Sequence, residues 1–353
     1  MRTFAAVTGS RAGFRRDHSP PGVCRALTAG LALVAGLGLA ACDDPGSGDV
    51  LAIEAVGAVD AALVFDANGT GSLDGGDEPL SDWTLNLDQP AGGTVASAIT
   101  DEDGIARFQE VPVGRLVPSV PAGELGDTLD FVAASVEPFT LAAQQSAQLA
   151  VALTLPSRLL EEARTTPSGV PLFVEGVALN PFAPGDRSLH LRAGSHYLRV
   201  LSVEEGAVAF GDSVRVRGRT ATDQGVAVLD GQAVFRLGGA SEVPTPIALS
   251  TGEAAGAQGG SLDAALARIR DADILDVTDE GDDGVVLNID DGSGVLALRF
   301  REFLGADPDL IDPETDRISV CVGLLVPTRT GQTVAWEIRP RAQSDVAIVR
   351  DGE

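Results

Sequence analysis

The sequence predicts an all-β protein made of several small modules. Short runs of alternating apolar and polar residues, such as the run with Trp83, Leu85 and Leu87, are separated by glycine, asparagine and aspartate turns, which is the pattern of antiparallel strands. A chain of 353 residues is too long for one ordinary core and indicates two or three domains of about 100 to 150 residues. Two segments in the second half also match each other at a separation of about 100 residues, which indicates an internal duplication.

The composition is strongly acidic and contains no lysine. There are 51 acidic residues against 25 basic ones, all of them arginine, and the formal net charge is -26. The absence of lysine excludes Schiff-base chemistry and a phosphate-binding lysine. The negative charge argues against a protein built as a whole to hold nucleic acid, because phosphate neutralisation supplies most of that affinity. A GC-rich coding sequence or a salty habitat would produce such a surface, and selection for a cationic partner is the alternative.

The first 42 residues have the pattern of an export signal. Basic residues between Arg2 and Arg25 precede an apolar run over 26–41, which ends in Leu-Ala-Ala followed by Cys42. The run is short for a membrane span of about 20 residues. This ending resembles the lipobox of bacterial lipoproteins, and the resemblance implies that Cys42 is acylated and becomes the new N-terminus. We therefore expect an exported protein that is lipid-anchored to a bacterial membrane, on its periplasmic or cell-surface side. A signal-anchor helix with an incidental cysteine is the alternative, and 43–50 is predicted to be a linker.

Residues 66–78 form a loop rich in side-chain oxygens between two predicted strands. Counted from Asp66, oxygen-bearing side chains fall at the first, third, fifth, ninth and twelfth positions, with Gly71 at the sixth to allow a sharp turn. One short loop needs this spacing to collect six to eight oxygens around Ca²⁺. The sequence therefore predicts a calcium site. A solvated loop of Asn-Gly and Asp-Gly turns is the alternative.

The loop belongs to a longer pattern over residues 51–156. A strand ends in Phe65, the loop follows, and the motifs Thr100-Asp101-x-x-Gly104 and Val113-Gly114-x-Leu116 come later. The pattern resembles the B-type repeats of Ser-Asp-rich surface adhesins of Gram-positive bacteria and their prealbumin-like relatives. The resemblance implies a β-sandwich that is stiffened by calcium. By position, the implied ligands are Asp66, Asn68, Thr70, Asp74 and Asp77, with Ser72 offering at best its carbonyl and Glu78 in reserve.

Two similar modules are predicted after a linker at 157–170, the first over 171–249 and the second over 250–350. The run Leu189-His-Leu191-Arg-Ala-Gly194-Ser195 matches Leu287-Asn-Ile289-Asp-Asp-Gly292-Ser293. The strand pattern of each copy is typical of a small barrel or sandwich, and the order of its motifs resembles OB-fold modules of secreted bacterial nucleases and other envelope proteins. A helix is predicted over 261–273 at the start of the second module, because three apolar residues there have helical spacing and Ser261 is a suitable N-cap.

The first OB-like module carries a basic patch. OB-folds bind oligonucleotides or oligosaccharides across strands 2 and 3 and the adjoining loops. In this module that surface would offer His190, Arg192, Tyr197, Arg199, Arg215, Arg217 and Arg219. Such a surface could hold an anionic glycan or single-stranded nucleic acid, although one tyrosine makes a thin stacking platform. The alternative is that the arginines simply fill the outward face of alternating strands, and the second copy favours it because the basic residues are not repeated there.

The sequence offers no motif for catalysis. His190 and His196 lie on one predicted hairpin, and Cys321 lies in an apolar run where a packed thiol is expected. We therefore expect no enzyme activity. Two functions remain open. The first is a non-catalytic cell-envelope lipoprotein with a calcium-stiffened sandwich and modules that contact a protein or glycan partner. The second is an OB-fold protein that binds an anionic polymer, as an accessory to a secreted nuclease.

Overall fold

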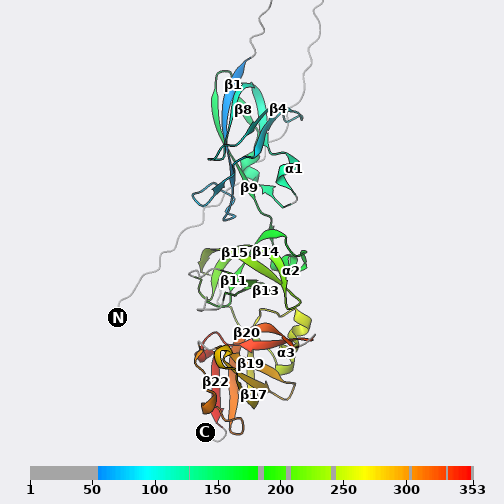
Figure 1. Ribbon diagram of the computed structural model, residues 1–353, viewed down its shortest axis with the longest axis vertical. Helices are drawn as coiled ribbons and strands as arrows, with labels where there is room; N and C mark the ends of the chain where they lie inside the picture. Colours follow the sequence, from blue (N-terminus) through cyan, green and yellow to red (C-terminus); the bar gives the residue numbers. More distant parts are fainter. Residues whose placement is uncertain are drawn as a thin grey trace, which may run out of the picture. The chain divides into compact units, whose positions relative to one another are not determined.

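The computed structural model describes residues 55–350 except 127, 182–186, 204–207, 240–243, 302–303 and 331–332. The predicted leader at 1–42, with Cys42, and the linker at 43–50 lie outside the described residues. The described strands fall into three groups (Figure 1). They form a β-sandwich followed by two OB-like barrels, so the predicted fold class is confirmed. None of the helices in this part of the chain has the length and hydrophobicity that a bilayer span requires.

The first group forms a β-sandwich of two sheets. One sheet contains β1 (Val56–Phe65), β2 (Glu78–Pro79), β5 (Ile105–Pro112), β7 (Asp130–Phe131) and β9 (Ser146–Thr154), and β1 runs antiparallel to β5 and parallel to β9. The other contains β3 (Thr84–Asp88), β4 (Thr94–Ile99), β6 (Gly114–Ser119) and β8 (Phe139–Leu141), and the helix α1 (Ala122–Leu125) follows β6.

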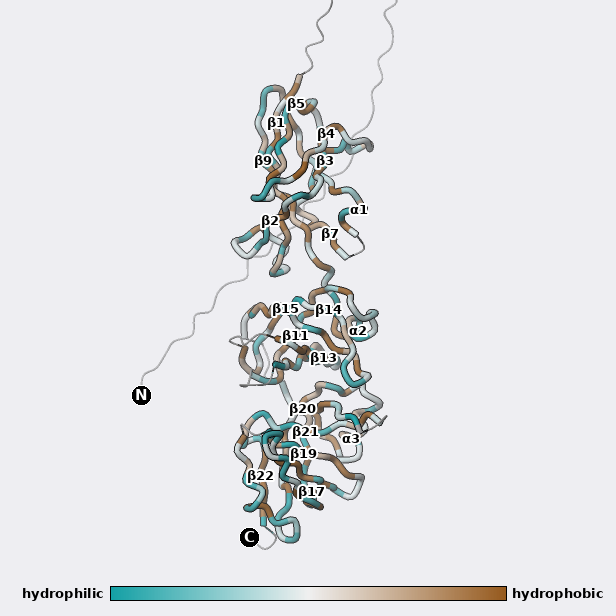
Figure 2. The backbone as a smooth tube through the Cα atoms, in the orientation of Figure 1, coloured by the Kyte–Doolittle hydropathy of each residue, from teal (hydrophilic) through white to brown (hydrophobic). Residues whose placement is uncertain are grey.

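Alternation along the strands builds the core of the sandwich. Val59, Ala61 and Leu63 of β1 are fully buried, as are Leu85 and Leu87 of β3, while the residues between them face outward at least in part. Figure 2 shows the backbone of these strands coloured by hydropathy. Successive side chains of a strand point to opposite faces, so this period fixes which face of each sheet is buried.

The second group closes into a barrel. It contains β11 (Pro171–Ala178), β12 (Leu189–Ala193), β13 (His196–Leu201), β14 (Asp212–Asp223) and β15 (Val226–Gly239). The strands pair in the order β11-β12-β13-β15-β14, and β14 pairs back with β11. The β13–β15 pair is parallel, while the pairs β11–β12, β12–β13, β14–β15 and β11–β14 are antiparallel. This is the five-stranded Greek-key barrel of an OB-fold.

The third group repeats this barrel with the same strand order. It contains β17 (Leu266–Asp279), β18 (Val285–Asp290), β19 (Leu296–Phe300), β20 (Asp316–Thr330) and β21 (Thr333–Arg339), and β20 pairs back with β17. A sixth strand, β22 (Val346–Arg350), lies antiparallel to β20. The duplication that the sequence indicated therefore corresponds to two barrels of one topology.

The structural repeat begins earlier than the matching sequence segments. β10 (Ser157–Arg158) and the helix α2 (Leu160–Thr165) precede the first barrel, and β16 (Ile247–Ala248) and the helix α3 (Thr251–Gly260) precede the second. β10 pairs in parallel with β11 just as β16 pairs in parallel with β17. The segment 157–170, which we predicted to be a linker, therefore holds the counterpart of the leading strand and helix of the second barrel.

The prediction of a helix over 261–273 is wrong. The helix α3 ends at Gly260, and Leu266 and Ile269 lie in strand β17. The true N-cap is Ser250, whose hydroxyl accepts from the Glu253 backbone N–H while the Glu253 carboxylate accepts from the Ser250 backbone N–H in a capping box. Pairing of β17 with both β18 and β20 outweighs the helical spacing, because tertiary context overrides local propensity.

Candidate functional site

The loop between β1 and β2 is wrapped around the carboxylate of Asp66. One oxygen of Asp66 accepts from the backbone N–H of Thr70 at 3.0 Å, and the other accepts from that of Gly71 at 2.8 Å. Asp66 is only 1% exposed. Gly69 and Gly71 both have positive φ, which glycine adopts without strain. The Asx and glycine spacing of the sequence therefore gives a tight turn with a buried carboxylate at its start.

The second half of the loop is organised by Asp74. Its carboxylate accepts from the Gly76 backbone N–H at 2.8 Å, from the Asn68 side-chain amide at 3.0 Å and from the Thr70 hydroxyl at 3.1 Å. The bond from Gly76 and that from Asn68 lower the pKa of Asp74. The Thr70 hydroxyl also lies 3.0 Å from the Ser72 carbonyl oxygen. Three of the implied ligands thus interact with one another directly.

Asp77 is the carboxylate of this loop whose burial is least offset by hydrogen bonds. Its Oδ2 accepts from the Asp74 backbone N–H at 3.0 Å, but its Oδ1 is buried and has no hydrogen-bond partner. Burial raises the pKa of Asp77, and repulsion from Asp74 and Asp66 adds to the rise. Across the residues that the structure describes, however, three acidic, histidine or cysteine side chains are nowhere grouped so as to hold a metal ion. The loop brings the implied ligands together, but in the described residues they do not form a preformed coordination site for a metal ion.

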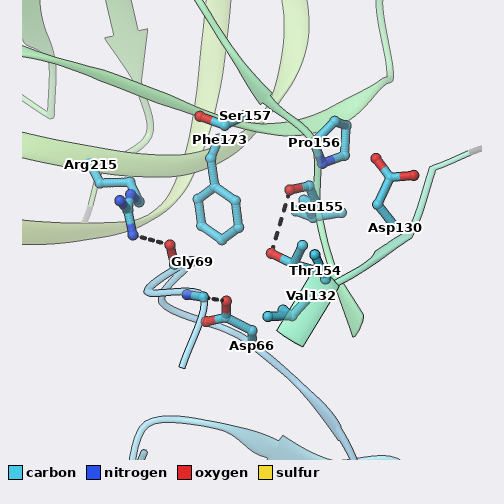
Figure 3. Close-up of a pocket in the computed structure, with 12 residues that line it drawn as sticks. Asp66, Gly69, Asp130, Val132, Thr154, Leu155, Pro156, Ser157, Phe173 and Arg215 are labelled. Carbon is cyan, nitrogen blue, oxygen red and sulfur yellow. Dashed lines mark hydrogen bonds between the residues drawn. The ribbon is translucent and has the colours of Figure 1, made fainter. Parts of the chain in front are cut away.

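Strand β14 of the first barrel places its arginines against this loop. The Arg215 guanidinium donates to the carbonyl oxygens of Asn68 and Gly69, and it also donates to Glu175 at 2.6 and 2.8 Å. Figure 3 shows the Arg215 side chain reaching Gly69 beside the ring of Phe173. The predicted calcium loop and the predicted basic patch therefore meet at one joint between the sandwich and the first barrel.

Arg217 makes a second contact across the same joint. Its guanidinium lies 5.6 Å from the centre of the Phe65 ring and 3.7 Å from the Glu78 carboxylate. Glu78, the reserve calcium ligand, is thus paired with an arginine of the barrel. The third arginine of the strand, Arg219, donates to the Gly169 carbonyl at 3.1 Å and remains exposed.

A cavity of about 320 Å³ lies at this joint (Figure 3). Asp66, Gly69 and Asp130 of the sandwich line it together with Phe173 and Arg215 of the barrel. A Cβ atom at Gly69 would lie 3.1 Å from both the Phe173 ring and the Arg215 side chain. Glycine at this position therefore allows the loop to approach the barrel closely.

The remaining residues of the predicted ligand face do not form a surface. His190, Tyr197 and Arg199 are only 2 to 5% exposed, which corrects the expectation that they face outward. Tyr197 belongs to the hydrophobic cluster of the second barrel, together with Leu179 and Val226 of the first. The second barrel covers these side chains, and no signal in the sequence of the first barrel alone could show it. Arg192 is half-exposed and donates to the Gly194 carbonyl of its own hairpin.

Sequence reasoning missed a buried ionic cluster between the barrels. Asp263 is fully buried, accepts from the indole N–H of Trp336 at 3.2 Å and lies 3.9 Å from Arg199, which also pairs with Asp223 at 2.9 Å. Burial raises the pKa of Asp263, although the Arg199 charge opposes the rise. Arg164 of α2 bridges the barrels by donating to the carbonyls of Tyr197 and Gly260. The only hint in the sequence is one aspartate within the apolar run at 262–267.

Comparisons with known proteins bear on the fold alone. No protein-family model matches the sequence, and no curated protein matches it. Among solved structures, a murine DNA-binding protein bound to double-stranded DNA is 12% identical, with a TM-score of 0.26, over 51% of this chain and 97% of that one. The shaft pilin spaA from Lactobacillus rhamnosus GG is 10% identical, with a TM-score of 0.20, over 53% and 96%. The hypothetical protein ygiW from E. coli is 13% identical, with a TM-score of 0.21, over 24% and 97%.

Proposed function

We propose that this protein is a non-catalytic cell-envelope lipoprotein that is tethered through Cys42. Its three β modules serve as a structural support and as a surface for interaction. The observation that carries the proposal is the joint between modules. Arg215 and Arg217 fasten the first barrel to the sandwich loop, and Tyr197 and Arg199 are buried against the second barrel. Side chains that a free OB-fold would offer to a ligand are used to hold neighbouring modules, which suits a stalk or spacer.

Calcium would stiffen the joint in this proposal. Asp74 and Asp77 would hold the ion with the side-chain oxygens of Asn68 and Thr70, while Asp66 anchors the turn. The fit is supported by Oδ1 of Asp77, which is buried without a hydrogen-bond partner, and by the raised pKa of Asp77, which is caused first by burial and then by repulsion from Asp74 and Asp66. A bound divalent cation would neutralise the carboxylate charges of the loop and would be coordinated by its oxygens. The loop carbonyls of Asn68 and Gly69 would keep their bonds to Arg215.

The tether is tested by metabolic labelling with an alkyne fatty acid in a bacterial host. We expect the full chain to incorporate label and to sediment with membranes, and we expect Cys42→Ser to lose both properties, because acylation of this thiol is the source of anchoring. Cys321→Ser is the matched control, since Cys321 is fully buried, and it should label like the wild type. An unlabelled, intact wild-type leader would refute the tether.

We do not propose binding of an anionic polymer, because the arginines that it requires are paired or buried. Arg215 pairs with Glu175, Arg217 with Glu78 and Arg199 with Asp223. We expect the chain from residue 43 onward, which contains the compact unit Ile53–Glu353, to pass through heparin and single-stranded DNA columns at low salt. Salt-dependent retention that is lost in Arg215→Ala with Arg217→Ala would restore the polymer-binding alternative and overturn this part of the proposal.

A further inference from the structure

The last described strand of the second barrel lies at the edge of its sheet. Among the residues that the structure describes, β22 pairs with β20 alone. The strand is also exposed to a large extent, since Ile348 is 36% exposed and Val349 is 48% exposed. A strand at a sheet edge presents a row of N–H and C=O groups to which a second strand can be added. β22 therefore offers a template for an extended peptide.

A cavity of about 420 Å³ lies beside this edge strand. It is lined by alternate residues of β22, namely Val346, Ile348 and Arg350, which share one face of the strand. Leu310 of the short helix η4 (Pro308–Leu310) lines it as well, and this side chain is 70% exposed. Covering exposed apolar area is favourable. The cavity therefore suits apolar side chains that project from a strand added to β22.

The segment 307–314, which contributes to the lining of this cavity, is acidic. It has four exposed carboxylates, those of Asp307, Asp309, Asp312 and Glu314. Within the described part of the chain, no arginine or histidine forms an ion pair with any of the four. Asp316, which also lines the cavity, differs from them because it pairs with Arg350 at 3.3 Å. Carboxylates that have no cationic partner favour positive charge on an approaching chain.

We propose that β22 and this cavity dock an extended, basic segment of a partner protein. The backbone of the segment would add to the edge of β22, and its apolar side chains would enter the cavity beside Leu310 and Ile348. Its arginine or lysine side chains would pair with the carboxylates of the segment 307–314. Main-chain hydrogen bonds give affinity in this mode of recognition, and the pockets for alternate side chains give specificity.

A second copy of this chain is a poorer occupant of the same edge. It would bring its own segment 307–314 to the cavity, and the two sets of carboxylates would repel each other. The proposal rests on the interaction role proposed above, but it does not depend on the tether at Cys42. Peptide binding and fatty-acid labelling can therefore fail separately.

The test is fluorescence anisotropy of a labelled heptapeptide, RRVTVRR, titrated with the chain from residue 43 onward. The ionic strength is about 0.15 M, where a Debye length of about 8 Å screens general attraction to an acidic surface. The two valines and the end arginines of this peptide share one face of an extended strand. We expect saturable binding of RRVTVRR, whereas EEVTVEE, with the same apolar centre and the opposite charge, should not bind.

Two further peptides separate strand addition from charge attraction. They have the sequence RRVTVRR with N-methyl groups on either the odd or the even residues. Successive N–H groups of a strand point to opposite edges, so one version should bind about tenfold or more weakly and the other like the parent peptide. Equal affinity of the parent and both methylated peptides would overturn the proposal.

The apolar part of the site is tested by Leu310→Ser. The substitution removes the exposed side chain that lines the cavity and should weaken binding of RRVTVRR by about threefold or more. Leu275→Ser is the matched control, because Leu275 is 53% exposed on β17 and is not among the described residues that line the cavity. It should bind like the wild type. Far-UV circular dichroism shows whether each variant is folded.

The acidic part is tested by Asp307→Asn with Asp309→Asn, which keeps an acceptor at position 307 for the backbone N–H of residue 309. Loss of two charges should weaken binding of RRVTVRR by about threefold or more. Asp282→Asn with Asp283→Asn is the matched control, because both residues are exposed in the short helix η2 (Gly281–Asp283). Equal weakening by both double variants would overturn the proposal, and so would a dimer in sedimentation velocity that leaves the peptide unbound.

Discussion

The guanidinium of Arg215 donates to the backbone carbonyl of Gly69, so that the first barrel and the sandwich are joined at the turn of the Asp66 loop. The same guanidinium donates to the Asn68 carbonyl at 3.2 Å. Gly69 has a φ of 67° and no side chain, and this lets the barrel approach. Two features that are 146 residues apart in sequence therefore act as one joint.

We expect Arg215→Gln to loosen this joint. The variant loses charge-assisted bonds to two carbonyls, each worth about 1.5–3 kcal/mol at most. The segment 155–159 between β9 and α2 should then be cleaved faster by a nonspecific protease at low concentration. Arg219→Gln is the control, because Arg219 is exposed and donates to Gly169 on the barrel side. Equal cleavage rates for both variants and the wild type would show that the joint does not depend on Arg215.

Asp77→Asn should have opposite effects with and without calcium. In calcium-free buffer the substitution removes a carboxylate whose charge is disfavoured by burial and by repulsion from Asp74 and Asp66, so the melting temperature should stay level or rise. Millimolar calcium should raise the melting temperature of the wild type and leave that of the variant unchanged. Differential scanning calorimetry measures both. The control is Asp103→Asn, because Asp103 is exposed and lies outside the loop; its melting temperature should respond to calcium like that of the wild type. A wild-type melting temperature that does not change with calcium would contradict the ion site.

The difference in stability between Asp77→Asn and the wild type should change with pH in a definite direction. The folded-state pKa of Asp77 is raised, so the folded protein binds this proton more tightly than the unfolded chain does. The contribution of Asp77 to the free energy of unfolding is therefore largest at low pH and declines as pH rises through the folded pKa. The difference in melting temperature between Asp77→Asn and the wild type should grow over that interval in calcium-free buffer. A difference that stays constant with pH would contradict this account.

Arg199→Met should destabilise the contact between the two barrels. It leaves the buried Asp263 without its nearest charge partner, and breaking a buried pair in this way costs about 3–5 kcal/mol. The pKa of Asp263 is already raised by burial, and loss of Arg199 should raise it further, so the loss of stability should increase as pH rises. Adding Asp263→Asn, which keeps an acceptor for Trp336, should recover part of the loss. Urea unfolding at several pH values measures these effects, and a fully additive double variant would mean that the two residues are not coupled.

Cys321 should react with a thiol reagent only after unfolding. The side chain is fully buried in β20, and burial raises the pKa of its thiol, so neither access nor the thiolate is available. In the chain from residue 43 onward, where it is the single cysteine, the labelling rate should follow the unfolding rate across urea concentrations. Fast labelling in buffer would place the thiol at the surface.

Much of the fold could be predicted from local pattern. The alternation of Trp83, Leu85 and Leu87 predicted the strand that is β3, and the matched runs at Leu189 and Leu287 predicted two copies of one barrel. The helix over 261–273 failed where local spacing and pairing disagreed, because strand β17 gains partners on both sides. The Asp66 loop was also placed correctly between strands, since its turn chemistry lies within a dozen residues.

The sequence by itself determined the all-β class, the order of the modules and the position of the loop between strands, because alternation and turn residues act over a few neighbouring positions. Only the tertiary structure decided what the basic residues do. Arg215 caps the sandwich loop, and Arg199 is buried against Asp263. The sequence shows the same residue type in each case. The role of each arginine depends on which distant carbonyl, carboxylate or aromatic ring the folded chain brings close to it, and charge pairing becomes significant within about 4 Å.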